Sequence, residues 1–107
     1  MKLVLAIINH DDANTVTQSL TKAGFSSTKL ATTGGFLMAG NMTILVGVDE
    51  EKVQAVIDII REHCHSRKQM IPTTTEMRYG YYPSMPVEVV VGGATIFVVD
   101  IERFERV

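Results

Sequence analysis

Three glycines, an aromatic ring and an amide lie close together in the segment TKLATTGGFLMAGN. The residues of interest there are Gly34, Gly35, Phe36, Leu37, Gly40 and Asn41. Glycines leave backbone N–H groups free to bind phosphate oxygens, an apolar face suits a flat base, and an amide both donates and accepts hydrogen bonds. Such a set fits a purine that carries a phosphate. A hairpin loop with Phe36 packed in the core is the alternative, because the phosphate-loop pattern G-x-x-x-x-G-K-[ST] is absent.

Three other clusters carry side chains that could do chemistry. The run HCH at 63–65 places neighbouring ligands about 100° apart on a helix, which disfavours a metal site. Asp11 and Asp12 stand at the start of a predicted helix, where acidic residues act in capping. The run RYGYY at 78–82 lacks the surrounding basic stripe of a nucleic-acid platform and is interpreted as a solvated loop. Since no catalytic set can be assembled, we predict neither an enzyme nor a cofactor.

Composition narrows the possible partners and the compartment. The chain has 107 residues, 46% of them apolar, which is enough for one domain over 1–107 with its own core. Ten basic residues against 12 acidic ones give a net charge of −2, so neither nucleic acid nor a membrane surface is predicted as a partner. The single Cys64 excludes a disulfide framework, and no signal peptide or apolar run of the ~20 residues that span a membrane is seen. These features predict a cytoplasmic protein.

The first half of the chain predicts three strands and a helix. Lys2–Asn9 is a nearly continuous apolar run that is typical of a central strand. A helix should begin near Asp11, bury a stripe of Val16, Leu20 and Ala23, and close at Gly24. Strands are predicted at 25–31 and 41–48, on either side of the glycine segment.

The second half predicts a helix, a long excursion and two strands. The helix should begin at 49–51, bury a stripe of Val53, Val56, Ile57 and Ile60, and end near His63. The segment 66–86 follows neither periodicity and is predicted to be a long, mobile excursion. Strands at 88–91 and 94–99 are predicted to form a hairpin through Gly92 and Gly93.

The resulting order β-α-β-β-α-β-β predicts an α+β fold, a ferredoxin-like β-α-β-β-α-β sandwich with an extra C-terminal strand. Both helices should cover one face of the sheet. The last two strands carry large apolar residues on both faces, more than one layer of helices could bury, which predicts oligomerisation through the sheet. These residues are Val89, Val90, Val91, Ile96, Phe97, Val98 and Val99.

The segment that begins at Thr28, together with Asn41, GVD at 47–49 and PVEVVVGGATIFV at 86–98, resembles the PII-like cyclic di-AMP receptors of Gram-positive bacteria. This resemblance extends over nearly the whole chain. It implies a cytoplasmic signal-transduction protein that forms a homotrimer and binds one cyclic dinucleotide in each cleft between subunits. It implies a receptor rather than an enzyme, with a downstream protein partner that stays unknown.

The resemblance also implies roles for individual residues. Phe36 would stack on an adenine beside Leu37 and Gly35, Asn41 would bind a base edge, Thr28 and Gly47 would line the phosphate and ribose region, and Phe97 would form a further wall. Aromatic stacking contributes ~1–3 kcal/mol per base, and an amide pairs well with adenine.

One departure from the family pattern concerns charge. Family members typically carry an arginine where this chain has Ser26, and losing such a contact weakens binding by roughly one to two decades. Lys29 and Arg106 could compensate; strand alternation turns Lys29 away from Thr28, so we favour Arg106. Our hypothesis is a receptor that reports occupancy through the segments 32–40 and 66–86. The alternative is a divergent trimer that binds another adenine nucleotide or only a protein.

Overall fold

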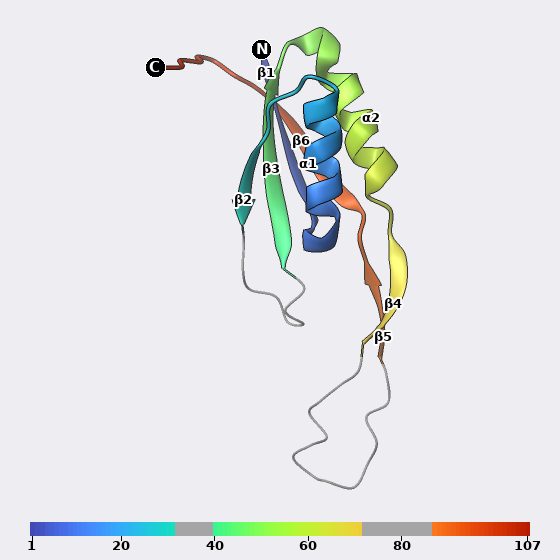
Figure 1. The fold of residues 1–107 in the computed structure, drawn as a ribbon. Helices are drawn as coiled ribbons and strands as arrows, with labels where there is room; N and C mark the ends of the chain where they lie inside the picture. Colours follow the sequence, from blue (N-terminus) through green and yellow to red (C-terminus); the bar gives the residue numbers. More distant parts are fainter. Residues whose placement is uncertain (32–39, 72–86) are drawn as a thin grey trace, which may run out of the picture.

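A four-stranded antiparallel sheet forms the body of the molecule, in the strand order β2-β3-β1-β6 (Figure 1). The computed structural model describes residues 1–31, 40–71 and 87–107. The strands of this sheet are β1 (Lys2–Asn9), β2 (Thr28–Ala31), β3 (Asn41–Val48) and β6 (Ala94–Asp100). The predictions of β1 and β3 are confirmed to the residue, whereas the second strand begins at Thr28 and not at Phe25.

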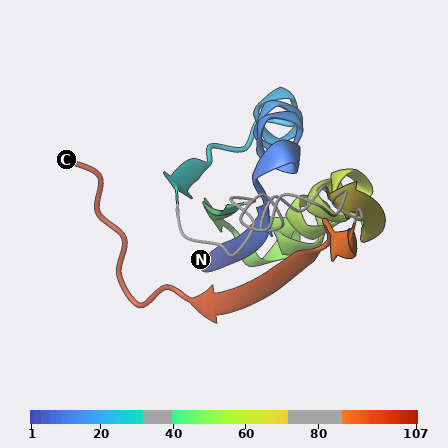
Figure 2. The ribbon, with the colours of Figure 1, turned by 90° about the horizontal axis from the view of Figure 1, so that it is seen from below.

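Two helices, α1 (Ala13–Lys22) and α2 (Val53–His63), lie together on one side of this sheet (Figure 2). Single turns of 3-10 helix precede them, η1 (His10–Asp12) and η2 (Glu50–Lys52). Side-chain burial alternates along β1 and β3, because successive residues of a strand point to opposite faces. The core between sheet and helices is Val4, Ala6, Ile8, Ala13, Val16, Leu20, Met42, Ile44, Val46, Val48, Val56, Ile60 and Cys64.

The observed helix boundaries agree with those predicted from the acidic residues at the helix N-termini and from the apolar stripes. The side chain of Asn9 caps η1 by accepting a hydrogen bond of 2.8 Å from the backbone N of Asp11. Within α1 the buried stripe includes Ala13 but not the predicted Ala23, which is exposed. Ala23 follows the last residue of the helix, and Gly24 then turns the chain at φ +90°, a conformation that favours glycine. The second helix ends at His63, as predicted.

The predicted excursion after α2 is wrong over its first residues. Strand β4 (Arg67–Ile71) pairs antiparallel with β5 (Val87–Val91) in a separate two-stranded ribbon that projects from the body (Figure 1). The remainder of the predicted excursion, 72–86, lies outside the described residues. The observed order of the described elements is therefore β-α-β-β-α-β-β-β, with one strand more than predicted.

The predicted hairpin through Gly92 and Gly93 is also wrong. Both glycines have positive φ, +85° and +79°, as such a turn requires. However, β5 pairs with β4 and β6 pairs with β1, so the two glycines pass the chain from the ribbon to the sheet. Gly92 lies against the His65 carbonyl, and this close approach directs the chain toward β1. The local turn signal was correct, whereas the choice of strand partner depended on residues far away in sequence.

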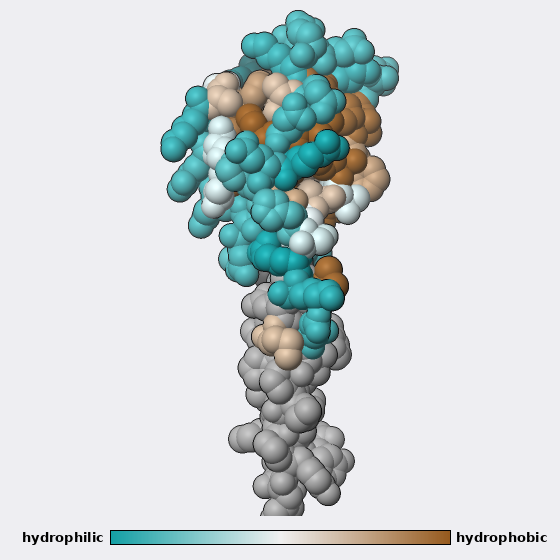
Figure 3. All heavy atoms as spheres, turned by 90° about the vertical axis from the view of Figure 1, so that its right-hand side faces the viewer, coloured by the Kyte–Doolittle hydropathy of each residue, from teal (hydrophilic) through white to brown (hydrophobic). Residues whose placement is uncertain are grey.

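The sheet face opposite the helices carries apolar side chains. The register sets Leu5 between Leu45 and Phe97, and Leu3 opposite Val99. Phe97 is 51% exposed and Val99 47% exposed. On the side of the molecule seen in Figure 3, apolar residues gather in the upper part beside a mostly hydrophilic surface. Among the residues described, no helix is long and apolar enough to cross a membrane.

Replacing Gly92 with alanine should destabilise the fold more than replacing Gly24. Both sites have positive φ, which costs a side chain about 1–2 kcal/mol. At Gly24 a Cβ meets nothing within 4 Å, but at Gly92 it would collide with the His65 carbonyl oxygen, adding about 1–3 kcal/mol. Urea unfolding of Gly92→Ala and Gly24→Ala measures the difference. Equal losses in the free energy of unfolding would show that the ribbon base can move aside.

Cys64 should react slowly with iodoacetamide in the folded protein. Its side chain belongs to the core, and burial, with a smaller effect of the Asp12 charge, raises the thiol pKa to about 11. At pH 8 only about one thiol in a thousand is then ionised, and the thiolate is the nucleophile. Mass spectrometry should find fast alkylation only in urea, and a folded-state rate that rises with pH toward 11. Equally fast alkylation with and without urea contradicts this burial.

Candidate functional site

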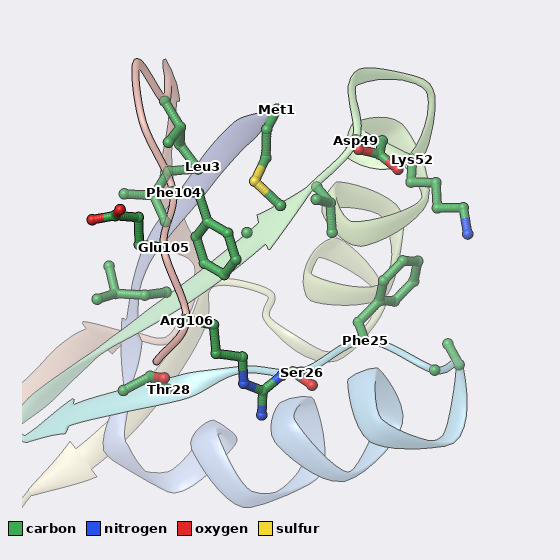
Figure 4. Close-up of a pocket in the computed structure, with 16 residues that line it drawn as sticks. Met1, Leu3, Phe25, Ser26, Thr28, Asp49, Lys52, Phe104, Glu105 and Arg106 are labelled. Carbon is green, nitrogen blue, oxygen red and sulfur yellow. The ribbon is translucent and has the colours of Figure 1, made fainter.

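A cavity of about 740 Å³ opens at one end of the sheet, between the start of β2, the end of β3 and the C-terminal segment 101–107 (Figure 4). Its size falls within the range of small-molecule sites. The walls are formed by Met1, Leu3, Ala23, Gly24, Phe25, Ser26, Thr28, Leu45, Gly47, Val48, Asp49, Lys52, Ile101, Phe104, Glu105 and Arg106. Apolar residues of the sheet thus meet polar and charged residues of the flanking segments.

The register of the strands places the residues that form the floor of this cavity. Thr28 lies opposite Leu45 on β3, and Leu3 lies opposite Gly47. Gly47 has no side chain to fill the space above it, and its nearest neighbour to a Cβ would be Ile101 Cδ1 at 3.9 Å. The backbone N of Ile101 donates to the Met1 carbonyl at 3.1 Å, which fixes the point where the C-terminal segment leaves the sheet.

The charged groups at the cavity differ in how they are paired. Glu105 accepts from Arg103 at 2.7 Å, so its charge is balanced within the same segment. Neither the ammonium of Lys52 nor the guanidinium of Arg106 has a hydrogen bond or ion pair with another described residue, although the backbone N of Lys52 donates to the Asp49 carbonyl at 2.9 Å. Beside the cavity, Lys2 donates to Asp100; this hydrogen bond raises the pKa of Lys2 and lowers that of Asp100. The two unpaired cations are the groups that could meet an anion.

Arg106 and Lys52 point in different directions (Figure 4). The guanidinium of Arg106 points toward Ser26, whereas the ammonium of Lys52 points away from the cavity. Lys29 lies on the opposite face of β2, as strand alternation predicts, and its Nζ donates to Asn14 Oδ1 of α1 at 3.4 Å. Arg106 is therefore the cation whose direction suits an anion beside Ser26.

The residues predicted to bind a ligand fall into separate groups. Thr28, Gly47 and Arg106 meet at the cavity. Asn41 begins β3 at its other end, ~20 Å from Gly47 by the rise of a strand. Phe97 lies opposite Leu5 on the open face of the sheet and does not line the cavity. Gly35, Phe36 and Leu37 lie outside the described residues. Within the described part of one chain, the predicted residues therefore do not form a single site.

Several cavity residues carried no signal that the sequence analysis could use. Phe25 is partly buried and packs against the core from the turn before β2. Phe104 lies in the C-terminal segment, where no hydrophobic periodicity exists to place it. Only the register of β1 with β3 and β6 brings these two rings to the same cavity, and a single sequence does not reveal that register.

The other reactive residues have structural partners. Asp12 accepts from both terminal nitrogens of Arg67, at 3.2 and 3.3 Å, and Arg67 also donates to the His65 carbonyl. His63 Nε2 lies 3.0 Å from Ser19 Oγ, which links α2 to α1. Over 1–31, 40–71 and 87–107, no group of three or more His, Cys, Asp or Glu residues is arranged to hold a metal ion.

Comparisons with known proteins agree with the resemblance seen in the sequence. The model of a family described as cyclic-di-AMP receptor matches residues 1–107. A solved structure, described as a functionally unknown protein from Pediococcus pentosaceus ATCC 25745, is 39% identical and has a TM-score of 0.73. That match covers 99% of this chain and 96% of the other. With an α+β fold and a family match along its whole length, this chain belongs to the cyclic-di-AMP receptor family.

Proposed function

We propose that this protein is a cytoplasmic signal-transduction receptor that binds cyclic di-AMP between the subunits of a PII-like homotrimer. The observation that carries this proposal is the cavity of about 740 Å³, which gathers Thr28, Gly47 and Arg106 in a chain of the receptor family. The strand order β2-β3-β1-β6 supports a ferredoxin-like subunit with the ribbon β4–β5 added. Binding without catalysis is the simplest use of this site, which offers no nucleophile paired with a base among its lining residues.

A ligand shared between subunits accounts for the separation of the predicted residues. Asn41 and Gly47 stand ~20 Å apart on the same strand, too far for both to touch one base. In a ring of identical subunits, one end of β3 in one subunit can face the opposite end in its neighbour. The cavity would then supply one wall of the cleft, and the Asn41 end of the next chain would supply the other.

The open sheet face supports assembly. Phe97 and Val99, with Leu30 at 48% exposure, leave large apolar groups in contact with water in a single chain. Contiguous apolar patches of this kind mark interfaces in soluble proteins. Packing three such faces around one axis would bury them and would bring the cavities to the subunit boundaries.

The 3-10 turn η1 supports communication between the site and the ribbon. The backbone N of His10 donates to the Gly40 carbonyl at 3.1 Å, next to the start of β3. Two residues later, Asp12 holds Arg67 at the base of the ribbon. A change at 32–40 on ligand binding can therefore reach the segment 66–86 through η1, which gives the occupied receptor a signal to pass to a downstream protein.

The alternative is a divergent trimer that recognises another adenine nucleotide or only a protein. Ser26 favours this alternative, because it removes a charge-assisted contact expected in the family. Isothermal titration with cyclic di-AMP, cyclic di-GMP and ATP separates the two. We expect saturable binding near one cyclic di-AMP per subunit. Binding of ATP alone, or of none of the three, would overturn the proposed ligand.

Arg106→Ala should weaken binding of cyclic di-AMP by about 10- to 100-fold, because a hydrogen bond to a charged group contributes about 1.5–3 kcal/mol. Lys29→Ala is the matched control, since Lys29 reaches α1 and not the cavity. Adding Ser26→Arg to Arg106→Ala should restore much of the affinity. Unchanged affinity in Arg106→Ala contradicts this role for Arg106. An equal loss of affinity in Arg106→Ala and Lys29→Ala contradicts it as well.

A further inference from the structure

The last residues of the chain form a wall of the cavity without belonging to the sheet. Backbone hydrogen bonding of the described residues ends at Ile101, whose N donates to the Met1 carbonyl at 3.1 Å. Beyond that point Phe104, Glu105 and Arg106 all line the cavity. The wall is therefore held at one end by the sheet, and its Phe104 and Arg106 side chains face the space that a ligand would occupy (Figure 4).

Phe104 is an unusual residue for such a wall. It is a large apolar side chain that stays 60% exposed although it lines a cavity. Its ring projects from the C-terminal segment into the cavity (Figure 4). Leu3 and Leu45 of the sheet contribute apolar surface to the same cavity. An exposed aromatic face beside aliphatic side chains suits a flat base, because every base offers a π face for stacking.

The charged side chains of the C-terminal segment also leave a cation free to meet a ligand in the cavity. The side chains of Phe104 and Arg106 project toward the cavity, whereas the carboxylate of Glu105 points the other way (Figure 4). The ion pair of 2.7 Å between Arg103 and Glu105 agrees with this arrangement. It also balances the carboxylate, so that of the two charged residues of the segment that line the cavity, Glu105 and Arg106, only Arg106 has no ion pair with a described residue. An aromatic ring and a cation two residues apart match the base and the phosphate of one nucleotide.

We propose that the C-terminal segment is a nucleotide grip, in which Phe104 stacks on a base of the ligand while Arg106 binds the adjacent phosphate. The proposal rests on the proposed function and adds to it the residue that recognises the base in this cavity. Phe104 makes this contact with its ring face, so the grip depends on aromaticity at position 104 and not on apolar volume alone.

Titration calorimetry with cyclic di-AMP on Phe104→Leu and Phe104→Tyr tests the grip. Leucine keeps apolar volume but loses the ring, and we expect it to weaken binding by about 5- to 100-fold. Tyrosine keeps the ring and should bind within about two-fold of the wild type, since stacking depends on the π face. Met70→Ala removes an exposed apolar side chain from the ribbon and should leave affinity unchanged.

Two further measurements separate the grip from other roles of Phe104. The melting temperature of each ligand-free variant should match that of the wild type, because the side chain is mostly exposed. Light scattering should find the same oligomeric state, and a changed state in Phe104→Leu would overturn the grip in favour of a subunit contact. Equal affinity of Phe104→Leu and wild type overturns the grip alone. Absence of binding by the wild type overturns the proposed function and the grip together.

Discussion

Strand β1 is paired along its length on both sides, with β3 over Lys2–Asn9 and with β6 over Lys2–Ile8. This double pairing satisfies the backbone of the central strand and sets which residues of three strands share a face. One face buries Val4, Ala6 and Ile8 against the helices. A shift of one residue would exchange the two faces, so the core fixes the register, and the register places Gly47 and the end of β6 beside the start of the chain.

The cavity follows from where these strands end. Because β6 ends beside Met1, the chain leaves the sheet next to the end of β3 and continues as the wall that contains Phe104 and Arg106. The ribbon leaves at the other end, where Arg67 is held by Asp12 and where Gly92 lies against the His65 carbonyl. The sheet thus separates the cavity from the ribbon, and β1 with η1 connects the two ends.

Elements with a local pattern could be predicted from the sequence. The apolar runs of β1 and β3 and the apolar stripe of α2 are local patterns, so a short window of sequence contains them. Strand β4 was missed because a two-stranded ribbon buries little, and its residues, such as the exposed Met70, need no hydrophobic periodicity. The wrong prediction of a hairpin at Gly92 has a related origin. The backbone angle φ depends on the local sequence, whereas the choice of strand partner depends on distant residues.

The candidate site was predictable only in part for a related reason. Thr28 and Gly47 lie on strands, so a family pattern can place them, and Arg106 was inferred from the charge missing at position 26. Phe104 follows neither a pattern nor a charge argument, because its position depends on the path of the chain after β6.

A cation in the C-terminal segment and a cation next to a strand differ in how the backbone positions them. An arginine at position 26 would precede β2 directly and be positioned by the sheet, whereas Arg106 follows five residues after the last backbone hydrogen bond described, at Ile101. Fixing the backbone of a residue costs about 1–2 kcal/mol, so each residue between Ile101 and Arg106 that becomes ordered on binding offsets part of the charge contact. In the proposed grip, stacking by Phe104 in the same segment would offset part of that cost. In the proposed complex the ring and the guanidinium would therefore depend on each other, and occupancy of the cavity would be linked to the conformation of the chain end.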